Sequence, residues 1–137
     1  MGAAWQSFAA GFPVLLTHLA VSAALLAAFM FLYVKMTPYK ELGLVREGNT
    51  AAAVSFGAII VGLSVPMAFC LAASVSLADI AIWGAATLFL QMLTFRLVDL
   101  IIRDLPRRIE AGEMAAAVLL AAFKLAAAAL ISAAVAG

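Results

Sequence analysis

The sequence predicts an all-α integral membrane protein whose four helices form two tandem helical hairpins. Three observations carry this prediction: the composition, four apolar runs of membrane-spanning length, and an internal sequence repeat. Of the 137 residues, 68% are hydrophobic and 11% are charged, and the mean hydropathy is +1.20. Soluble domains are about half apolar and about a quarter charged, so this chain lacks the polar surface that a soluble globule needs. We expect one membrane domain over residues 1–137.

The predicted spans follow from the length of the apolar runs. A hydrocarbon core about 30 Å thick requires about 20 apolar residues in a helix. Such runs occur at about residues 13–36, 50–77, 80–102 and 114–135. Pro13 suits the first turn of the first helix, where its missing N–H has no intrahelical role.

The segments between the runs differ in length. Residues 37–49 and 103–113 contain most of the nearby charge together with Pro and Gly, and we expect polar loops there. Between the second and third runs only Ser74, Ser76 and Asp79 interrupt the apolar sequence, so this turn must be tight and its two helices antiparallel.

The charged residues predict the orientation, because Lys and Arg next to spans are retained on the cytoplasmic side. Six basic residues flank the two polar loops: Lys35, Lys40, Arg46, Arg103, Arg107 and Arg108. Both loops are therefore expected in the cytoplasm and both termini outside. Trp5 and Trp83 would then lie at the outer interface, and Tyr33 and Tyr39 near the inner one.

The internal repeat appears when the chain is aligned with itself so that Gly48 meets Gly112. Residues 48–54 then match residues 112–118 at five of seven positions. The same shift superposes the first span on the third and the second on the fourth. Chance matching of alanine-rich sequence is the alternative, but the agreement of the span boundaries favours duplication into parallel repeats at about residues 13–77 and 80–136.

The repeated turns have a physical interpretation. Gly48 and Gly112 can adopt backbone angles that other residues avoid, while Asn49 or Thr50, and Glu113, lie where a cap or an acid would satisfy the first N–H groups of the next helix.

Small residues recur at four-residue spacing, which allows close helix packing in lipid. These rows serve either packing within the bundle or an interface between subunits. They are Ala20, Ala24 and Ala28; Ala53 and Gly57; Ala58 and Gly62; and Ala129, Ala133 and Gly137.

The chain from about Leu16 to Gly137 resembles a known family. The resemblance lies in residues 33–38 (Tyr-Val-Lys-Met-Thr-Pro), residues 47–53 (Glu-Gly-Asn-Thr-Ala-Ala-Ala), Gly62 with Pro66, and Trp83-Gly84 followed by Gln91. These features are similar to the YjfL-type proteins, domain-of-unknown-function family 350. The resemblance implies a small bacterial inner-membrane protein with four spans and implies no activity. Glu113 stands where members often have Asn.

Polar residues within the spans are the candidate site. Lys124 lies near the middle of the fourth span, where insertion of a charge costs about 2.5–3.5 kcal/mol. Gln91 lies at a similar depth in the third span, and its carbonyl is a plausible acceptor for Lys124. The alternatives are that the Lys124 stem reaches toward an interface or that burial removes its proton.

Arg96, Asp99 and Arg103 form a charged stripe on the third span. We favour an ion-pair ladder at spacings of three and four residues over a polar vestibule or a cluster around an oligomer axis. Pro66 predicts a bend in the second span, which either opens a polar pocket or only shapes the bundle.

No catalytic constellation is found in the sequence, and we expect neither an enzyme nor a cofactor. His18 and Cys70 are two soft ligands, whereas zinc requires three or four, so we predict no metal site.

Two functions remain. We favour a non-enzymatic scaffold that forms homo-oligomers and presents its basic loops to anionic lipid heads or to a cytoplasmic or membrane protein partner. The alternative is a subunit of an oligomeric channel or transporter for an ion or small solute, lined by Lys124, Gln91, Arg96 and Asp99. The net charge of +1 predicts no nucleic-acid partner.

Overall fold

The computed structural model describes residues 1–37 and 40–137. All regular secondary structure in these residues is α-helix. The four long helices are α1 (Gly2–Met36), α3 (Thr50–Ala73), α4 (Leu77–Ile101) and α6 (Met114–Ala136). Each is long and apolar enough to cross a membrane, which confirms the predicted all-α class with four candidate spans. The predictions made for Pro38 and Tyr39 lie outside the described residues.

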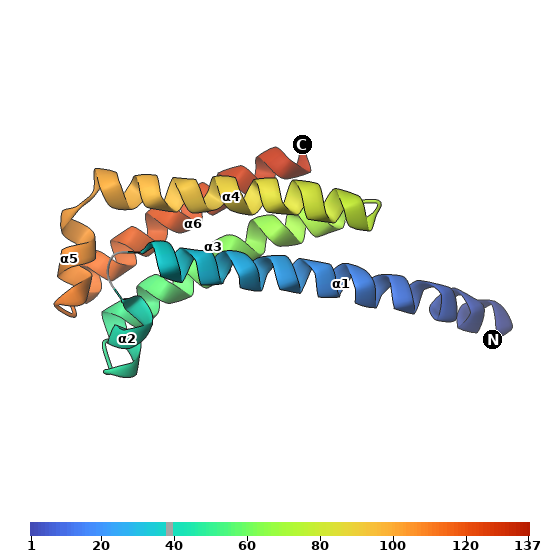
Figure 1. Cartoon of the computed structure of the whole chain (residues 1–137), viewed down its shortest axis with the longest axis horizontal. Helices are drawn as coiled ribbons and strands as arrows, with labels where there is room; N and C mark the ends of the chain where they lie inside the picture. The colour runs from blue at the N-terminus through green and yellow to red at the C-terminus, as the bar shows by residue number, and fades with distance from the viewer. Residues whose placement is uncertain (38–39) are drawn as a thin grey trace.

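The four long helices run roughly along one axis, and the short helices α2 (Glu41–Arg46) and α5 (Asp104–Glu110) lie together at one end of the molecule (Figure 1). We call this end the basic end. The opposite end carries the α3–α4 turn and both chain termini, and we call it the turn end. The connections expected to be polar loops thus each contain a short helix.

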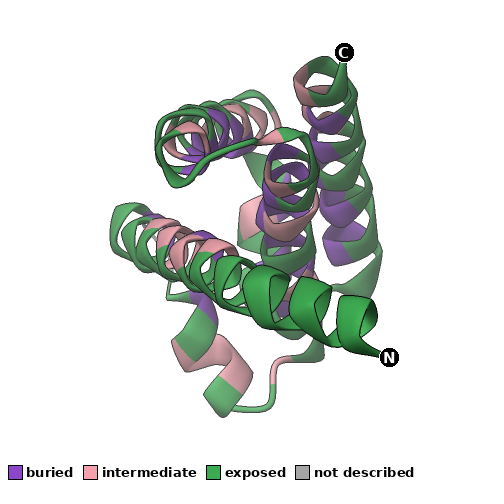
Figure 2. Cartoon of the chain, turned by 90° about the vertical axis from the view of Figure 1, so that its right-hand side faces the viewer, coloured by how far each residue is buried: buried purple, intermediate pink, exposed green. Residues whose placement is uncertain are grey.

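Helix α3 lies in the middle of the bundle, between α6 on one side and α1 and α4 on the other (Figure 2). One buried cluster joins α1, α3 and α4, and it includes Tyr33, Leu63 and Phe95. A second cluster at the basic end joins α3, α5 and α6 through small residues, among them Ala52 and Ala117. Because alanine has almost no side chain, α3 and α6 approach closely there.

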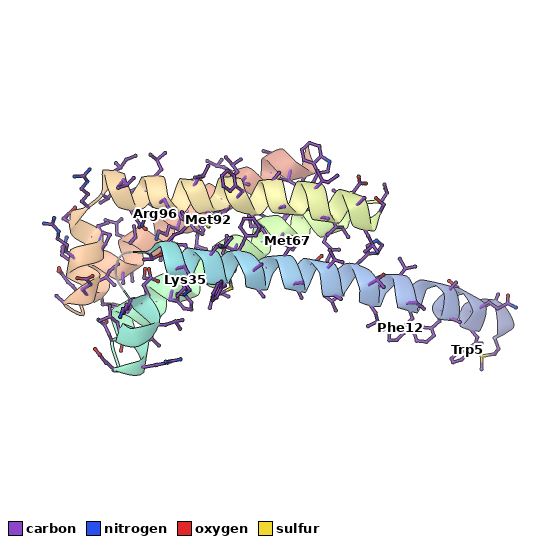
Figure 3. All side chains as sticks on the ribbon, viewed as in Figure 1. Trp5, Phe12, Lys35, Met67, Met92 and Arg96 are labelled. Atoms are coloured by element: carbon purple, nitrogen blue, oxygen red, sulfur yellow. The ribbon has the colours of Figure 1, made fainter. Side chains whose placement is uncertain are left out.

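Helix α1 begins at Gly2, so Pro13 lies inside the helix and not in its first turn. Residues 2–12 are rich in alanine, which favours helix, and a proline removes only one N–H from a helix that is exposed at this point. The first part of α1 projects beyond the other helices, and it carries Trp5 and Phe12 (Figure 3). Trp5, Phe8 and Phe12 stack in sequence, with ring centroids 5.7 and 5.0 Å apart.

The α3–α4 turn is as tight as the sequence predicts. Helix α3 ends at Ala73, and the Ser74 hydroxyl donates to the Cys70 carbonyl at 2.7 Å. The Ser76 hydroxyl accepts from the Asp79 N–H at 3.1 Å and so caps α4. Helix α3 continues without interruption through Pro66, which is buried.

The turn at Gly48 matches its prediction. Gly48 and Gly112 have φ of 90° and 84°, the left-handed region that favours glycine. The Asn49 side chain caps α3 by accepting from the Ala52 N–H at 3.0 Å. Its amide also donates to the Ile109 carbonyl at 3.0 Å, which ties the two connections together.

The turn at Gly112 differs from its prediction, because Glu113 makes no side-chain cap on α6. Its carboxylate instead contacts the Arg108 guanidinium through two nitrogens. The guanidinium offers this carboxylate two N–H donors and a full positive charge, whereas a cap would offer only backbone N–H groups, so the acid turns back toward α5.

Candidate functional site

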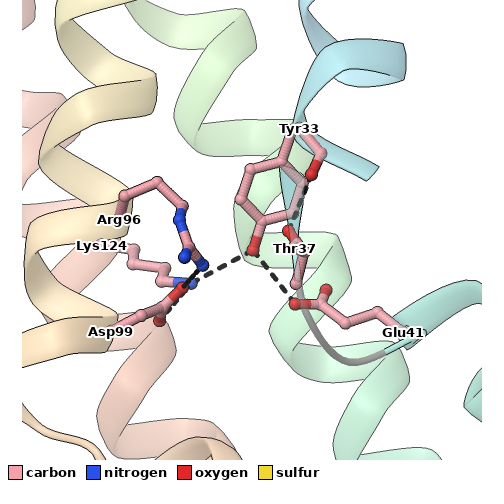
Figure 4. A network of polar contacts seen from close by, with 6 residues as sticks. All are labelled: Tyr33, Thr37, Glu41, Arg96, Asp99 and Lys124. Atoms are coloured by element: carbon pink, nitrogen blue, oxygen red, sulfur yellow. Dashed lines mark hydrogen bonds and ion pairs between the residues drawn. The ribbon is translucent and has the colours of Figure 1, made fainter. Parts of the chain in front are cut away.

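A network of buried and half-buried polar side chains near the basic end connects the long helices α1, α4 and α6 with the short helix α2 (Figure 4). We call it the Lys124 network. Its members come from α1, α2, α4 and α6, and they are Tyr33, Glu41, Arg96, Asp99 and Lys124.

Lys124 is fully buried and is the centre of the network. Its Nζ lies 2.9 Å from Asp99 Oδ1 in an ion pair and donates to the Tyr33 hydroxyl at 3.3 Å. The same nitrogen lies 5.7 Å from the ring centroids of Tyr33 and Phe95. A buried ammonium is tolerated in an apolar interior when a counter-charge and hydrogen-bond acceptors surround it, and Lys124 has both.

Helix geometry explains why Lys124 meets Asp99. Side chains lean toward the N-terminus of their own helix. Helix α6 starts at the basic end, so the Lys124 stem leans toward that end. Helix α4 starts at the turn end, so Asp99 leans the opposite way, and the two side chains converge.

The predicted bond between Lys124 and Gln91 is therefore wrong. Gln91 also lies on α4 and leans toward the turn end, away from the Lys124 amine. Gln91 is fully buried, and neither its Oε1 nor its Nε2 has a hydrogen-bond partner within residues 1–37 and 40–137.

Tyr33 joins Lys124 to the first connection. Its hydroxyl donates to Glu41 Oε1 at 3.0 Å while it accepts from Lys124, so one oxygen serves both roles. The Tyr33 carbonyl accepts from the Thr37 hydroxyl at 2.7 Å, at the C-terminal end of α1. Sequence reasoning placed Tyr33 in an interfacial aromatic belt and did not consider Glu41. The available signal was that a buried lysine needs acceptors and that Glu41 is the first acid after the first span.

The stripe on α4 forms only one of its two predicted ion pairs. Arg96 Nη1 lies 3.9 Å from Asp99 Oδ2, with the Arg96 side chain 24% exposed. Arg103 does not pair with Asp99, because α4 ends at Ile101 and Arg103 already belongs to the next connection. Its Nε donates to the Leu100 carbonyl at 3.1 Å instead.

A pocket of about 370 Å³ opens beside the network at the basic end, between α4 and α5. We call it the basic-end pocket. Asp99 belongs both to this pocket and to the network. The lining residues are Arg96, Asp99, Leu100, Arg103, Pro106, Arg107 and Glu110.

A second pocket, of about 480 Å³, lies at the turn end between α3, α4 and α6. Its lining includes Cys70, Asp79, Trp83 and Thr87. Gln91 follows Thr87 by one turn of α4 toward the middle of the helix. The polar side chains of α4 thus extend from this turn-end pocket to a fully buried amide.

The remaining predicted basic residues lie on the surface. Lys35 is exposed, with its Nζ 5.4 Å from the Phe31 ring centroid, and Lys40 and Arg46 are exposed at the two ends of α2. Arg108 lies 3.9 Å from Asp104 and contacts Glu113. The hydrogen bond between Arg108 and Glu113 raises the pKa of Arg108 above its ordinary value and lowers the pKa of the Glu113 carboxyl.

His18 and Cys70 do not form part of a metal centre in the described part of the chain. Within those residues no group of three or more His, Cys, Asp or Glu side chains is placed to hold a metal ion. His18 is half-buried on α1, and Cys70 is buried on α3 at the turn-end pocket.

The fold and site define a class: an integral membrane protein with four apolar helices and a buried, ion-paired lysine between them. Residues 7–135 match the model of the family described as Domain of Unknown Function (DUF350), and the chain belongs to this family. It is 33% identical over 89 residues to the UPF0719 inner membrane protein YjfL of Escherichia coli strain K12 and to the protein of the same name in E. coli O157:H7. These matches cover 65% of this chain and 67% of each relative. No solved structure matches the chain significantly.

Proposed function

We propose that this protein is a non-enzymatic scaffold of the bacterial inner membrane that forms homo-oligomers and presents its basic end to partners in the cytoplasm. The observation that carries the proposal is the division of its small-residue rows into buried and exposed ones. The location agrees with that of the E. coli relatives, which are named as inner membrane proteins.

One row packs inside the chain. Ala58 and Gly62 on α3 are buried, and the Phe95 ring lies directly over Gly62. This row therefore serves the bundle.

Two other rows are exposed along their whole length. They are Ala20, Ala24 and Ala28 on α1, and Ala129 and Ala133 on α6 with Gly137 just after its end. In the most apolar part of α1 only 6% of residues are buried, against 33–39% in the other three long helices. In lipid, exposed small-residue faces allow the backbones of two helices to approach, so these faces favour association with further copies.

The topology that we propose follows the distribution of charge. The six basic residues lie toward the basic end, which retains it in the cytoplasm and places both termini outside. Exposed Lys40, Arg46 and Arg107 are then available to anionic lipid heads or to an acidic protein surface.

We also infer that the chain arose by duplication. At the offset that aligns Gly48 with Gly112, the first residue of α3, Thr50, meets the first residue of α6, Met114. The Lys124 network is not duplicated, because the positions equivalent to Tyr33, Glu41 and Lys124 are Leu97, Leu105 and Ile60. The polar network therefore occurs once in the chain and has no counterpart at the repeat-related positions.

The oligomer is tested by cross-linking in native membranes and by the mass of the purified particle. Ala24→Leu fills the exposed row on α1 and is expected to shift the protein toward monomer. Ala23→Leu is the matched control, because Ala23 is also exposed but lies about 100° round the helix. A protein that is monomeric before substitution, or equal behaviour of the two variants, would contradict the proposal.

A second candidate function is the passage of an ion or small polar solute, and Gln91 is the observation that favours it. An unpartnered amide buried at membrane depth is costly unless water or a solute reaches it. Thr87, Gln91, Phe95 and Asp99 follow each other at four-residue intervals on the buried side of α4, between the two pockets. Phe95 is fully buried between Gln91 and Asp99 on this side of α4, so its ring would have to move for a solute to pass.

The route is tested by proton flux into liposomes that contain the purified protein and a pH-sensitive dye. Phe95→Ala is expected to raise the flux and Gln91→Leu to lower it. Thr94→Val is the control, because Thr94 lies on the same helix but its hydroxyl is exposed and donates to the Leu90 carbonyl. Flux that equals that of empty liposomes for the unchanged protein and for Phe95→Ala would exclude proton passage.

A further inference from the structure

The basic-end pocket brings together three arginines from two segments of the chain. Arg96 comes from α4, Arg103 from the residue before α5, and Arg107 from α5 itself. The other connection also carries basic residues, but Lys40 and Arg46 do not line this pocket. Convergence on one pocket of about 370 Å³ therefore distinguishes these arginines from a diffuse basic surface.

The guanidinium groups retain free donors. Arg107 makes no side-chain hydrogen bond or ion pair with the part of the chain that the structure describes. Within residues 1–37 and 40–137, Arg103 uses only its Nε, on the Leu100 carbonyl, and Arg96 makes one ion-pair contact, at 3.9 Å with Asp99. Each arginine can present several N–H groups in a planar fork, the arrangement that matches phosphate oxygens.

Two carboxylates also line the pocket, Asp99 and Glu110. Asp99 is already neutralised, because its Oδ1 is held by the buried Lys124 amine at 2.9 Å. Glu110 is exposed, where water screens its charge. With Lys124 counted, four positive charges face two negative ones, so the pocket favours an anion.

We propose that the basic-end pocket binds a phosphate group, through Arg96, Arg103 and Arg107. This inference deepens the proposed function and rests on its topology, because a pocket at the cytoplasmic ends of the helices lies at the depth of lipid headgroups. The same chemistry is present in an anionic phospholipid headgroup and in free inorganic phosphate. The lining also contains the apolar side chains of Leu100 and Pro106, which a lipid would contact and free phosphate would not.

The phosphate group also reaches the Lys124 network through Arg96. Among the described residues that line the pocket, Arg96 is the one whose side chain pairs with Asp99. A phosphate group that draws Arg96 away leaves Asp99 paired with Lys124 alone, so the buried ion pair persists when the pocket is filled.

The test compares two double variants of equal charge. Arg103→Gln with Arg107→Gln removes two arginines of the pocket, and Lys40→Gln with Arg46→Gln removes two basic residues of the other connection. All four side chains are exposed, so both proteins are expected to fold, and thermal unfolding in detergent checks this. Binding is measured by native mass spectrometry and thermal shift with three probes: inorganic phosphate, phosphatidylglycerol, and phosphatidylcholine as a headgroup without net charge.

We expect the pocket variant to bind phosphatidylglycerol about tenfold or more weakly, and the control variant to bind it within about twofold of the unchanged protein. Arg103→Lys with Arg107→Lys keeps the charge and loses the fork, and an intermediate affinity is expected. A response to inorganic phosphate alone assigns the site to the free anion, and a response to phosphatidylglycerol alone assigns it to the lipid. Equal losses in the two glutamine variants, or no binding of either anionic probe, would overturn the proposal.

Cross-linking of the same samples separates this result from the scaffold proposal. Loss of phosphatidylglycerol binding with an unchanged oligomer concerns the pocket only. An oligomer that fails to form while lipid binding remains would contradict the scaffold and leave the phosphate site intact.

Discussion

Lys124 on α6 and Asp99 on α4 form a buried ion pair, with Nζ and Oδ1 2.9 Å apart. The two helices start at opposite ends of the bundle, so their side chains lean toward each other and the pair closes with both residues in regular helix. Tyr33 and Glu41 extend the pair to α1 and α2. The network thus fixes where the first helix and the first connection lie against the second half of the chain.

Lys124→Met is expected to destabilise the protein by about 3–5 kcal/mol, because it leaves the Asp99 carboxylate buried without its partner. Lys124→Met combined with Asp99→Asn removes both charges and is expected to recover more than half of that loss. The measurement is thermal or denaturant unfolding in detergent. Lys35→Met, which changes an exposed lysine, is the control. If the double variant is as unstable as the single one, the pair is not the source of the effect.

Tyr33→Phe removes only the hydroxyl that bridges Lys124 and Glu41. We expect a loss of about 1–3 kcal/mol, because two buried charged groups lose a hydrogen-bond partner. Thr94→Val removes an exposed hydroxyl of α4 and is expected to change stability by less than about 0.5 kcal/mol. Denaturant titrations of both variants give the comparison, and equal effects would show that the Tyr33 hydroxyl contributes nothing specific.

Gly62→Ala tests the close packing of α3 on α4. A Cβ at Gly62 would lie 2.6 Å from Phe95 Cζ, so the ring must move and a loss of about 1–3 kcal/mol is expected. Phe95→Leu in the same chain makes room and is expected to restore part of the loss. Gly57→Ala on the same helix is the control, because a Cβ there meets no atom within 4 Å. Thermal unfolding of the four proteins decides the matter, and an unaffected Gly62→Ala would mean that Phe95 packs elsewhere.

The Arg108–Glu113 pair predicts an acid-dependent stability. Arg108 lowers the pKa of Glu113 in the folded protein, so the stabilisation is present above the unfolded pKa of a glutamate and is lost as pH falls through the lower folded value. We therefore expect the unfolding temperature to fall more steeply from about pH 5 to about pH 3 in the unchanged protein than in Glu113→Gln. The effect is small, because water screens this exposed pair. Parallel slopes for the two proteins would exclude the pair as its cause.

The four apolar helices, the tight α3–α4 turn and the glycines at positive φ follow from the sequence, because hydropathy and glycine conformations are local properties. The short helices α2 and α5 do not, since six or seven residues carry little periodic signal and tertiary packing decides their structure. The start of α1 was misplaced because Pro13 fits a first turn and also fits the exposed interior of a long helix.

The candidate site was predicted in part. Arg96 and Asp99 pair as the predicted ladder requires, and Lys124 is buried among polar groups, but its partner is Asp99 and not the predicted Gln91. The roles of Tyr33 and Glu41 in the network were not predicted. They depend on the packing of α1 against α4 and α6, which cannot be derived from a local residue pattern. The partner of Lys124 could have been predicted correctly from helix geometry alone. The direction in which side chains lean along each helix favours Asp99 over Gln91 as that partner.

The placement of both chain ends at the turn end has a practical side. A fluorescent protein or affinity tag fused to Met1 or Gly137 hangs from the end of the bundle that is farthest from α2 and α5. Either fusion leaves the arginine-lined pocket unobstructed. Imaging and purification can therefore use a protein whose basic end remains accessible to ligands and partners.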